Sequence, residues 1–177
     1  MYRTLTTFVI AAALLSGQNQ PKKARTLREV LLEQLHTTHD QEDWFVPINV
    51  AVEGLTPEQA KWTDGKGNHS IGQLVNHLAF WDRRSLDAFE GKQSAKFDGN
   101  NDETFNSFDS KTWAETVKRL DDVMKEWERA VEQADDSKLA EAASRIAHIG
   151  AHNAYHLGQI IYVRKLQGCW DPAKGVK

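Results

Sequence analysis

Two histidines near the carboxyl end of the chain have a spacing typical of metal ligands. His152 and His156 are four residues apart within an apolar pattern that predicts a helix, so both imidazoles lie on one face, one turn apart. The same face carries Ile149 and Ile160, which directs the imidazoles toward the interior of the protein. Two imidazoles in an apolar interior are costly unless their nitrogens are satisfied. A shared metal ion satisfies them, because each neutral ring donates a lone pair; a buried hydrogen-bond network is the alternative.

A third histidine, His77, lies in another helical pattern, three residues after Leu74 and four before Trp81. It therefore lies at the edge of an apolar face. From a facing helix, His77 would complete a site of three imidazole nitrogens with one coordination position open.

The remaining histidines leave other ligand sets open. His148 lies one turn before His152, and it could replace that residue or support it. His36 and His39 lie in the first helical pattern and could approach the same cavity. His69 precedes a predicted helix start, where a loop or cap residue is the simpler interpretation.

The elements that must position these side chains are helices. Apolar residues recur every three or four positions over four long stretches, whereas a strand requires a period of two. These stretches cover residues 26–54, 70–91, 113–131 and 135–168. Pro47 must kink or interrupt the first of them, because proline has no N–H to donate. Four long helices predict an all-α four-helix bundle.

A polar segment, residues 92–110, separates the second and third long helices. It contains Phe97, Phe105 and Phe108, and we expect these aromatic side chains to attach a long crossover to the bundle. Asparagines, aspartates and a glycine in this segment argue against strands.

Three pairs of residues predict helix starts. Thr26 with Glu29, and Ser70 with Gln73, have the spacing of capping boxes. The run Thr56 to Gln59 has the same spacing and places Pro57 at the first helical position. It predicts a short helical turn that ends near Trp62.

The first residues of the chain have the layout of a secretory signal peptide. A short basic start, an apolar stretch and small residues cover positions 1–17. We therefore expect export of the mature protein to the periplasm or the extracellular medium. A polar linker follows at 18–25, the bundle covers 26–168, and 169–177 form a C-terminal tail.

Composition limits the partners. The chain carries 22 basic and 25 acidic residues, a formal net charge of -3, and no basic stripe, which argues against nucleic-acid binding. The apolar leader is too short to span a bilayer well, so no stable membrane association is expected once it is removed. A small molecule is the expected partner, and formation of a homodimer stays open.

Three stretches resemble signatures of the DinB/YfiT-like family. They are His69 to Trp81 (HSIGQLVNHLAFW), His152 to Ile160 (HNAYHLGQI) and Leu55 to Trp62 (LTPEQAKW). The resemblance covers roughly residues 26–168, with the signatures in the expected order. It implies a four-helix bundle that binds one metal through His77, His152 and His156. His148 then falls outside the ligand set, while Gly158 and Gln159 match the last signature.

The resemblance also implies candidate activities. Characterised relatives include S-transferases and isomerases that use low-molecular-weight thiols, although the predicted leader argues against thiol transfer here. We expect a metal-dependent transferase or hydrolase, with zinc or nickel first and iron, manganese or copper also compatible. A bundle that binds metal or ligand without turnover is the alternative, and a purely structural hydrogen-bonded role is the third.

Other residues are candidates for supporting roles in such a site. Asp40, Asp43 or Asp82 could serve as a catalytic base. Aromatic side chains that could form the walls of a pocket are Trp44, Trp81 and Tyr155.

Overall fold

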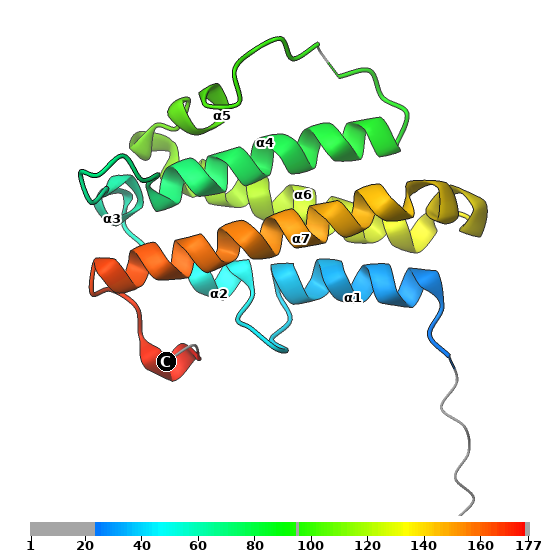
Figure 1. Cartoon of the computed structure of the whole chain (residues 1–177), viewed down its shortest axis with the longest axis horizontal. Coiled ribbons are helices and arrows are strands. Elements are labelled where there is room, and N and C mark those ends of the chain that lie inside the picture. Colours follow the sequence, from blue (N-terminus) through cyan, green and yellow to red (C-terminus); the bar gives the residue numbers. More distant parts are fainter. Residues whose placement is uncertain (1–23, 95, 176–177) are drawn as a thin grey trace, which may run out of the picture.

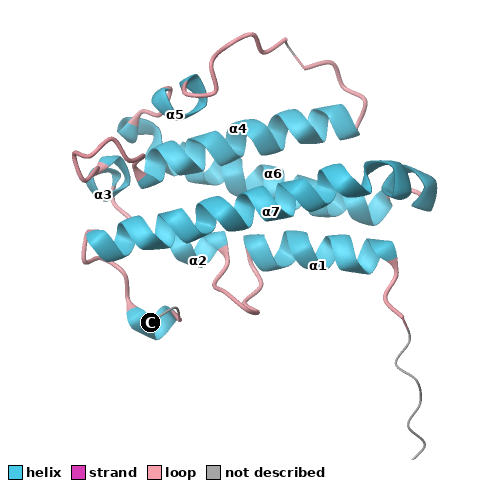
Figure 2. Cartoon of the chain, viewed as in Figure 1, coloured by secondary structure: helices cyan, strands magenta, loops and turns pink. Residues whose placement is uncertain are grey.

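The computed structural model describes residues 24–94 and 96–175. Four long helices form a bundle. They are α1 (Leu27–His39), α4 (Ile71–Phe89), α6 (Trp113–Gln133) and α7 (Asp136–Leu166), and they lie side by side in Figure 1. Both α1 and α4 pack against α6 and against α7, so α1 and α4 occupy opposite corners of the bundle. The described residues contain no strand (Figure 2). The predicted all-α bundle is therefore confirmed.

Cap geometry confirms the predicted helix starts. The hydroxyls of Thr26 and Ser70 accept from the backbone N–H groups of Glu29 and Gln73, each at 3.2 Å. The side chains of Glu29 and Gln73 accept from the cap residues' own N–H groups in return. The same reciprocal pair opens the short helix α3 (Pro57–Lys61). Each box satisfies backbone donors that the first helical turn leaves unpaired.

The interruption that Pro47 predicts in the first helix, residues 26–54, is confirmed, but it begins earlier than expected. α1 ends at His39, and the chain resumes helical structure only in α2 (Ile48–Val52). Pro47 directly precedes α2, and its ring disfavours helical geometry in the residue before it. Trp44 is 94% exposed in the intervening loop, so it supplies no apolar contact that would continue the helix.

The last two long helices follow each other with almost no connection. α7 begins directly after Asp135, whose carboxylate accepts from the backbone N–H of Lys138 at 2.8 Å, and the chain turns after it at Gly168, which has a positive φ of 68°. The apolar residues that recur along α6 at helical spacing are buried at five positions, namely Trp113, Leu120, Met124, Trp127 and Val131.

The segment between α4 and α6 runs over α4 (Figure 1) and contains the short helix α5 (Glu103–Asn106). Phe105 is buried, and Phe97 packs on aromatic rings of α4. The Phe108 ring lies directly on Gly72, where a Cβ would come within 2.1 Å of it. The predicted crossover held by aromatic side chains is therefore confirmed.

Short elements complete the described chain. The 3-10 helix η1 (Ser110–Thr112) precedes α6, and η2 (Pro172–Lys174) lies in the C-terminal tail. The tail packs on the bundle through Trp170, whose ring lies 5.3 Å from the Arg164 guanidinium carbon. The predicted leader at 1–17 lies outside the described residues. Within the described residues, no helix is both long and apolar enough to cross a bilayer.

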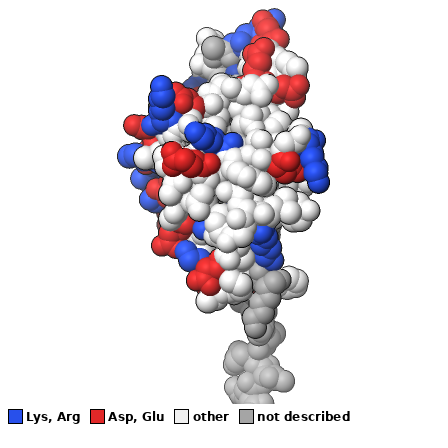
Figure 3. Space-filling model, turned by 90° about the vertical axis from the view of Figure 1, so that its left-hand side faces the viewer, with Lys and Arg blue, Asp and Glu red and all other residues white. Residues whose placement is uncertain are grey.

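Charges of both signs share the surface at one end of the bundle. Figure 3 views the molecule from the left-hand side of Figure 1, and basic and acidic side chains surround an uncharged centre there. No large patch of a single sign forms on this face.

Candidate metal centre

The structure brings His77 of α4 together with His152 and His156 of α7. Each ring offers one nitrogen, and these three atoms lie within 4.8 Å of one another. The Nε2 atoms of His77 and His152 are 3.1 Å apart, and the rings of His152 and His156 have centroids 4.6 Å apart. His77 and His156 are buried, and His152 is half-buried. These three residues are called the histidine triad below.

Hydrogen bonds determine which nitrogen faces the triad in two of these rings. The Thr104 hydroxyl donates to the Asn101 carbonyl at 2.6 Å, so it accepts from Nδ1–H of His77, also at 2.6 Å. Oε1 of Gln159 accepts from Nδ1–H of His156 at 2.7 Å. Since Nδ1 carries the hydrogen in both rings, the Nε2 lone pairs are free to bind a metal.

The chemistry of the triad fits a bound cation. Burial, followed by the neighbouring charges of His156 and His152, lowers the pKa of His77 to about 3. Burial, followed by the charge of His156, lowers the pKa of His152 to about 4. The rings are therefore neutral near neutral pH, and Nε2 of His77 lies 3.1 Å from Nε2 of His152, where either one shared proton or one shared cation satisfies both lone pairs. Neutral imidazole nitrogens are ligands that divalent transition metals accept, so the triad could hold a metal ion.

An aromatic stack supports the His77 ring from one side. Phe105 is stacked on His77 with centroids 3.9 Å apart, and on His69 at the same distance. Phe105 therefore lies between the two imidazoles. His69 precedes the cap residue Ser70, as the sequence predicts, and it is not part of the triad.

An open cavity of about 550 Å³ adjoins the triad. Its other described lining residues are Trp81, Ser85, Asn101, Phe105, Arg145, His148, Ile149 and Tyr155, none of them acidic. Two of the three aromatic residues expected to form walls are thus correctly placed. The third, Trp44, lies in the exposed loop after α1, and its assignment to the pocket is wrong.

Other predicted candidates lie outside the triad. His148 lines the cavity, but its Nδ1 donates to the main-chain carbonyl one turn earlier at 2.7 Å. None of the three candidate bases lines the cavity. Asp82 is fully buried and accepts from Nδ2 of Asn153 at 3.0 Å, Asp40 ends α1, and Asp43 is exposed.

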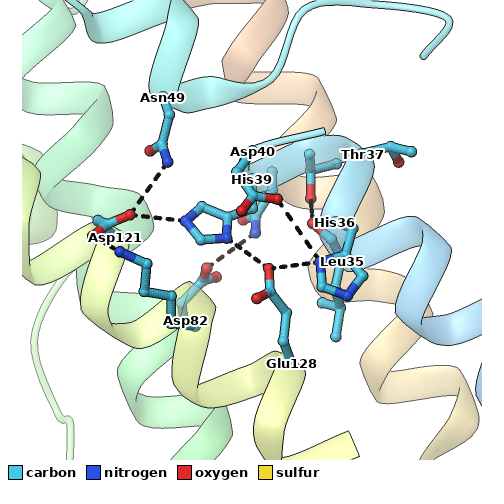
Figure 4. Close-up of polar contacts among 12 residues, drawn as sticks. Leu35, His36, Thr37, His39, Asp40, Asn49, Asp82, Asp121 and Glu128 are labelled. Carbon is cyan, nitrogen blue, oxygen red and sulfur yellow. Dashed lines mark hydrogen bonds and ion pairs between the residues drawn. The ribbon is translucent and has the colours of Figure 1, made fainter. Parts of the chain in front are cut away.

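The first-helix histidines form a second cluster between α1 and α6. His39 is fully buried, with Nδ1 2.6 Å from a Glu128 oxygen and Nε2 2.9 Å from an Asp121 oxygen (Figure 4). Burial alone would lower the pKa of His39, but these bonds outweigh it and raise the pKa. His36 lies at the edge, 3.4 Å from Glu128 and 3.8 Å from Asp40. His36, His39, Asp40, Asp121 and Glu128 are called the charged cluster below.

The sequence alone assigned no role to Asn76, and it identified Gln159 only as part of a family signature. Asn76 donates to the main-chain oxygen of Thr104 at 2.7 Å, and it accepts from Nη2 of Arg119 at 2.9 Å. These bonds tie the crossover to α4 and α6, and they hold Thr104 against His77. No local signal reveals this contact across 27 residues. Gln159 lies only three residues after its histidine partner, and helical spacing identifies it.

Comparison with known proteins agrees with this geometry. The model of the DinB superfamily matches residues 48–160, which include every member of the histidine triad. The match begins after α1, which is nevertheless the fourth long helix of the bundle. Neither the curated proteins nor the solved structures give a significant match. Since the family match covers more than half of its length, the chain belongs to the DinB superfamily.

Proposed function

We propose that this protein is a metal-dependent transferase or hydrolase that binds one divalent transition metal through His77, His152 and His156. The observation that carries the proposal is a set of three imidazole nitrogens within 4.8 Å of one another, beside an open cavity. Structural zinc sites usually have four protein ligands, whereas catalytic sites leave one position open. The described lining of the cavity offers no carboxylate as a fourth ligand.

The residues around the triad have separable roles in this proposal. Thr104 and Gln159 orient two of the rings by accepting their Nδ1–H groups. Trp81 and Tyr155 border the cavity and limit the shape of a substrate. A metal at such a site supplies Lewis acidity, which makes a water molecule or a thiol nucleophilic near neutral pH.

The donor set also guides the proposed metal. Three imidazoles suit zinc and nickel, and they also accept copper, iron or manganese, with geometry and supply deciding between them. We propose zinc or nickel as the resident ion.

A second candidate function is metal or ligand binding without turnover. The observation in its favour is that no described carboxylate lines the cavity. His148 is then the remaining titratable imidazole at the cavity, and it is exposed. A protein that only binds a metal needs no general base, whereas a hydrolase usually has one.

The first experiment is metal analysis of the full chain purified without a histidine tag. The proposal expects close to one equivalent of a transition metal, which a chelator removes and added zinc or nickel restores. A chain that carries no metal and takes up neither ion would overturn the metal site.

The second experiment separates an open site from a closed one. In the cobalt-substituted protein, azide, cyanide and simple thiols should change the visible spectrum, because they occupy the open position. A spectrum that none of them alters indicates a closed site and favours the non-catalytic function. Turnover is then tested with a panel of ester, amide and thiol-transfer substrates.

A further inference from the structure

We infer that the cavity beside the histidine triad binds a small organic anion, a carboxylate or a phosphate monoester, whose negative group is held by Arg145. The inference rests on the proposed metal site and specifies its substrate class.

Arg145 is an exposed arginine of α7. Arg145 lines the cavity, and the described part of the chain provides it with no ion pair or hydrogen bond. Arg28 and Arg83, by contrast, are engaged by acidic side chains. Arg28 bonds to Asp136 at 2.7 Å, and Arg83 bonds to Glu126 at 2.7 Å. The Arg145 guanidinium therefore keeps its donors available for a ligand, and guanidinium recognises carboxylate and phosphate groups through paired bonds.

Arg145 is in helical register with two members of the histidine triad. Arg145, Ile149, His152 and His156 follow one another along α7 at intervals of four, three and four residues, so they share one face. Two turns separate Arg145 from His152, a rise of about 10 Å. Because an arginine side chain spans part of that rise, a compact ligand can contact both the guanidinium and the triad.

The walls of the cavity carry hydrogen-bond donors. Oδ1 of Asn101 accepts from Nε1 of Trp81 at 3.1 Å, which leaves the Asn101 NH2 group to donate. Ser85 adds a hydroxyl to the same lining. The described lining of the cavity thus combines hydrogen-bond donors with the cationic side chain of Arg145, and it contains no acidic side chain. The aromatic rings of Trp81, Phe105 and Tyr155 complete the walls and suit an organic body.

The proposed metal ion and Arg145 would give the cavity a net positive charge. The triad supplies three neutral ligands, so a divalent ion there keeps its full positive charge. Together with Arg145, it gives the cavity a positive field that carboxylates do not offset. An anion is therefore the ligand whose binding these groups favour most.

The test uses the full chain loaded with cobalt. Benzoate, its neutral counterpart benzamide, and phenyl phosphate are titrated by calorimetry and by cobalt absorption. We expect at least one anion to bind about tenfold or more tightly than benzamide, because charge-assisted bonds are stronger than neutral ones. The stronger of the two anions identifies the carboxylate or the phosphate class.

Variants assign the effect to one side chain. Arg145→Gln should weaken binding of the anion about tenfold without changing the binding of benzamide or the cobalt content, and Arg145→Lys should restore part of the loss. Arg129→Gln is the matched control, because Arg129 is an exposed arginine of α6 outside this cavity. Equal affinities of wild type and Arg145→Gln for both anions would overturn the inference, as would equal affinities of the wild type for the anions and benzamide. Failure of the wild type to retain cobalt would instead overturn the proposed function, and the inference with it.

Discussion

Imidazoles lie at two helix–helix interfaces on opposite sides of the bundle, one between α4 and α7 and the other between α1 and α6. At the first interface, the rings of the histidine triad face one another, and Thr104 and Gln159 accept hydrogen bonds from two of them. At the second interface, His39 is enclosed between Asp121 and Glu128. Both sets of rings are largely removed from water.

The difference lies in what completes each cluster. Burial lowers the pKa of His39, but its bonds to Glu128 and Asp121 outweigh burial and raise the pKa, so a protonated ring lies between two carboxylates. Burial and neighbouring imidazoles lower the pKa of His77 and of His152, so the triad rejects protons and keeps lone pairs for a metal. Burial is common to both clusters, so the neighbours of each buried histidine decide whether its ring is charged or neutral.

The largest expected effect concerns metal binding by the triad. Replacement of His77, His152 or His156 by Ala should lower zinc affinity at least about 100-fold, because removing a ligand costs more than removing a residue that supports one. Competition with a chelator measures the affinity. It should persist in mild acid and fall only as the pH approaches the low pKa values of His77 and His152, about 3 and about 4, because protonated imidazole cannot bind a metal. His69→Ala is the control. Unchanged affinity in all three variants would place the metal elsewhere, and His148 would be examined next.

The next effect concerns the stability of the fold, and the zinc affinity of the triad should not change. His39→Ala removes the cation between Asp121 and Glu128, and it should lower the free energy of unfolding by about 3 kcal/mol. Because the folded pKa of His39 is raised, its contribution is complete below about pH 6.5 and is lost as the pH rises through the folded value. Urea denaturation at several pH values measures it.

A control from the same helix sharpens that measurement. His36 lies at the partly exposed edge of the charged cluster, so His36→Ala should cost less than about 1 kcal/mol. Equal losses in the two variants, or a loss of zinc affinity in His39→Ala, would contradict the separation of the two clusters.

The third prediction concerns the effect of Asp82, a buried residue of α4, on the pH dependence of stability. Burial raises its pKa to about 7, against the opposing bond from Asn153 and the charge of His39. Ionisation of Asp82 therefore destabilises the fold, with no penalty below about pH 4 and the full penalty above about pH 7. Asp82→Asn keeps an acceptor for Asn153 and should raise stability on the order of 2 kcal/mol at about pH 8.

The pH dependence makes this prediction specific. The gain from Asp82→Asn should vanish at about pH 4, where the wild-type carboxyl is protonated. Thermal denaturation across that range follows it, with Asp43→Asn as an exposed control. A gain independent of pH would show that Asp82 is not the titrating group.

The smallest effect concerns the residue that orients one ligand. Thr104→Val removes the acceptor of the His77 Nδ1–H group, and it should lower zinc affinity about tenfold. Thr104→Ser keeps the hydroxyl and should preserve affinity. Since both variants alter the same buried position, a loss shared equally by the two would point to packing and not to the hydrogen bond.

The sequence by itself determined the features that depend on neighbours within one or two helical turns. The apolar period predicts four long helices, and the capping boxes at Thr26 and Ser70 locate two of their starts. The pair His152 and His156 is visible for the same reason, because a spacing of four fixes a shared face. Family resemblance then added His77, which spacing alone left among several candidates.

Only the tertiary structure decided which distant residues meet. His39 has the same side chain as His77, but its partners lie 82 and 89 residues away along the chain. Thr104 reaches His77 only because the crossover folds back over α4 (Figure 1). Helical periodicity reports which face of a helix is buried, whereas the chemistry of a buried ring depends on the side chains that packing brings opposite it, and those are set by contacts between helices.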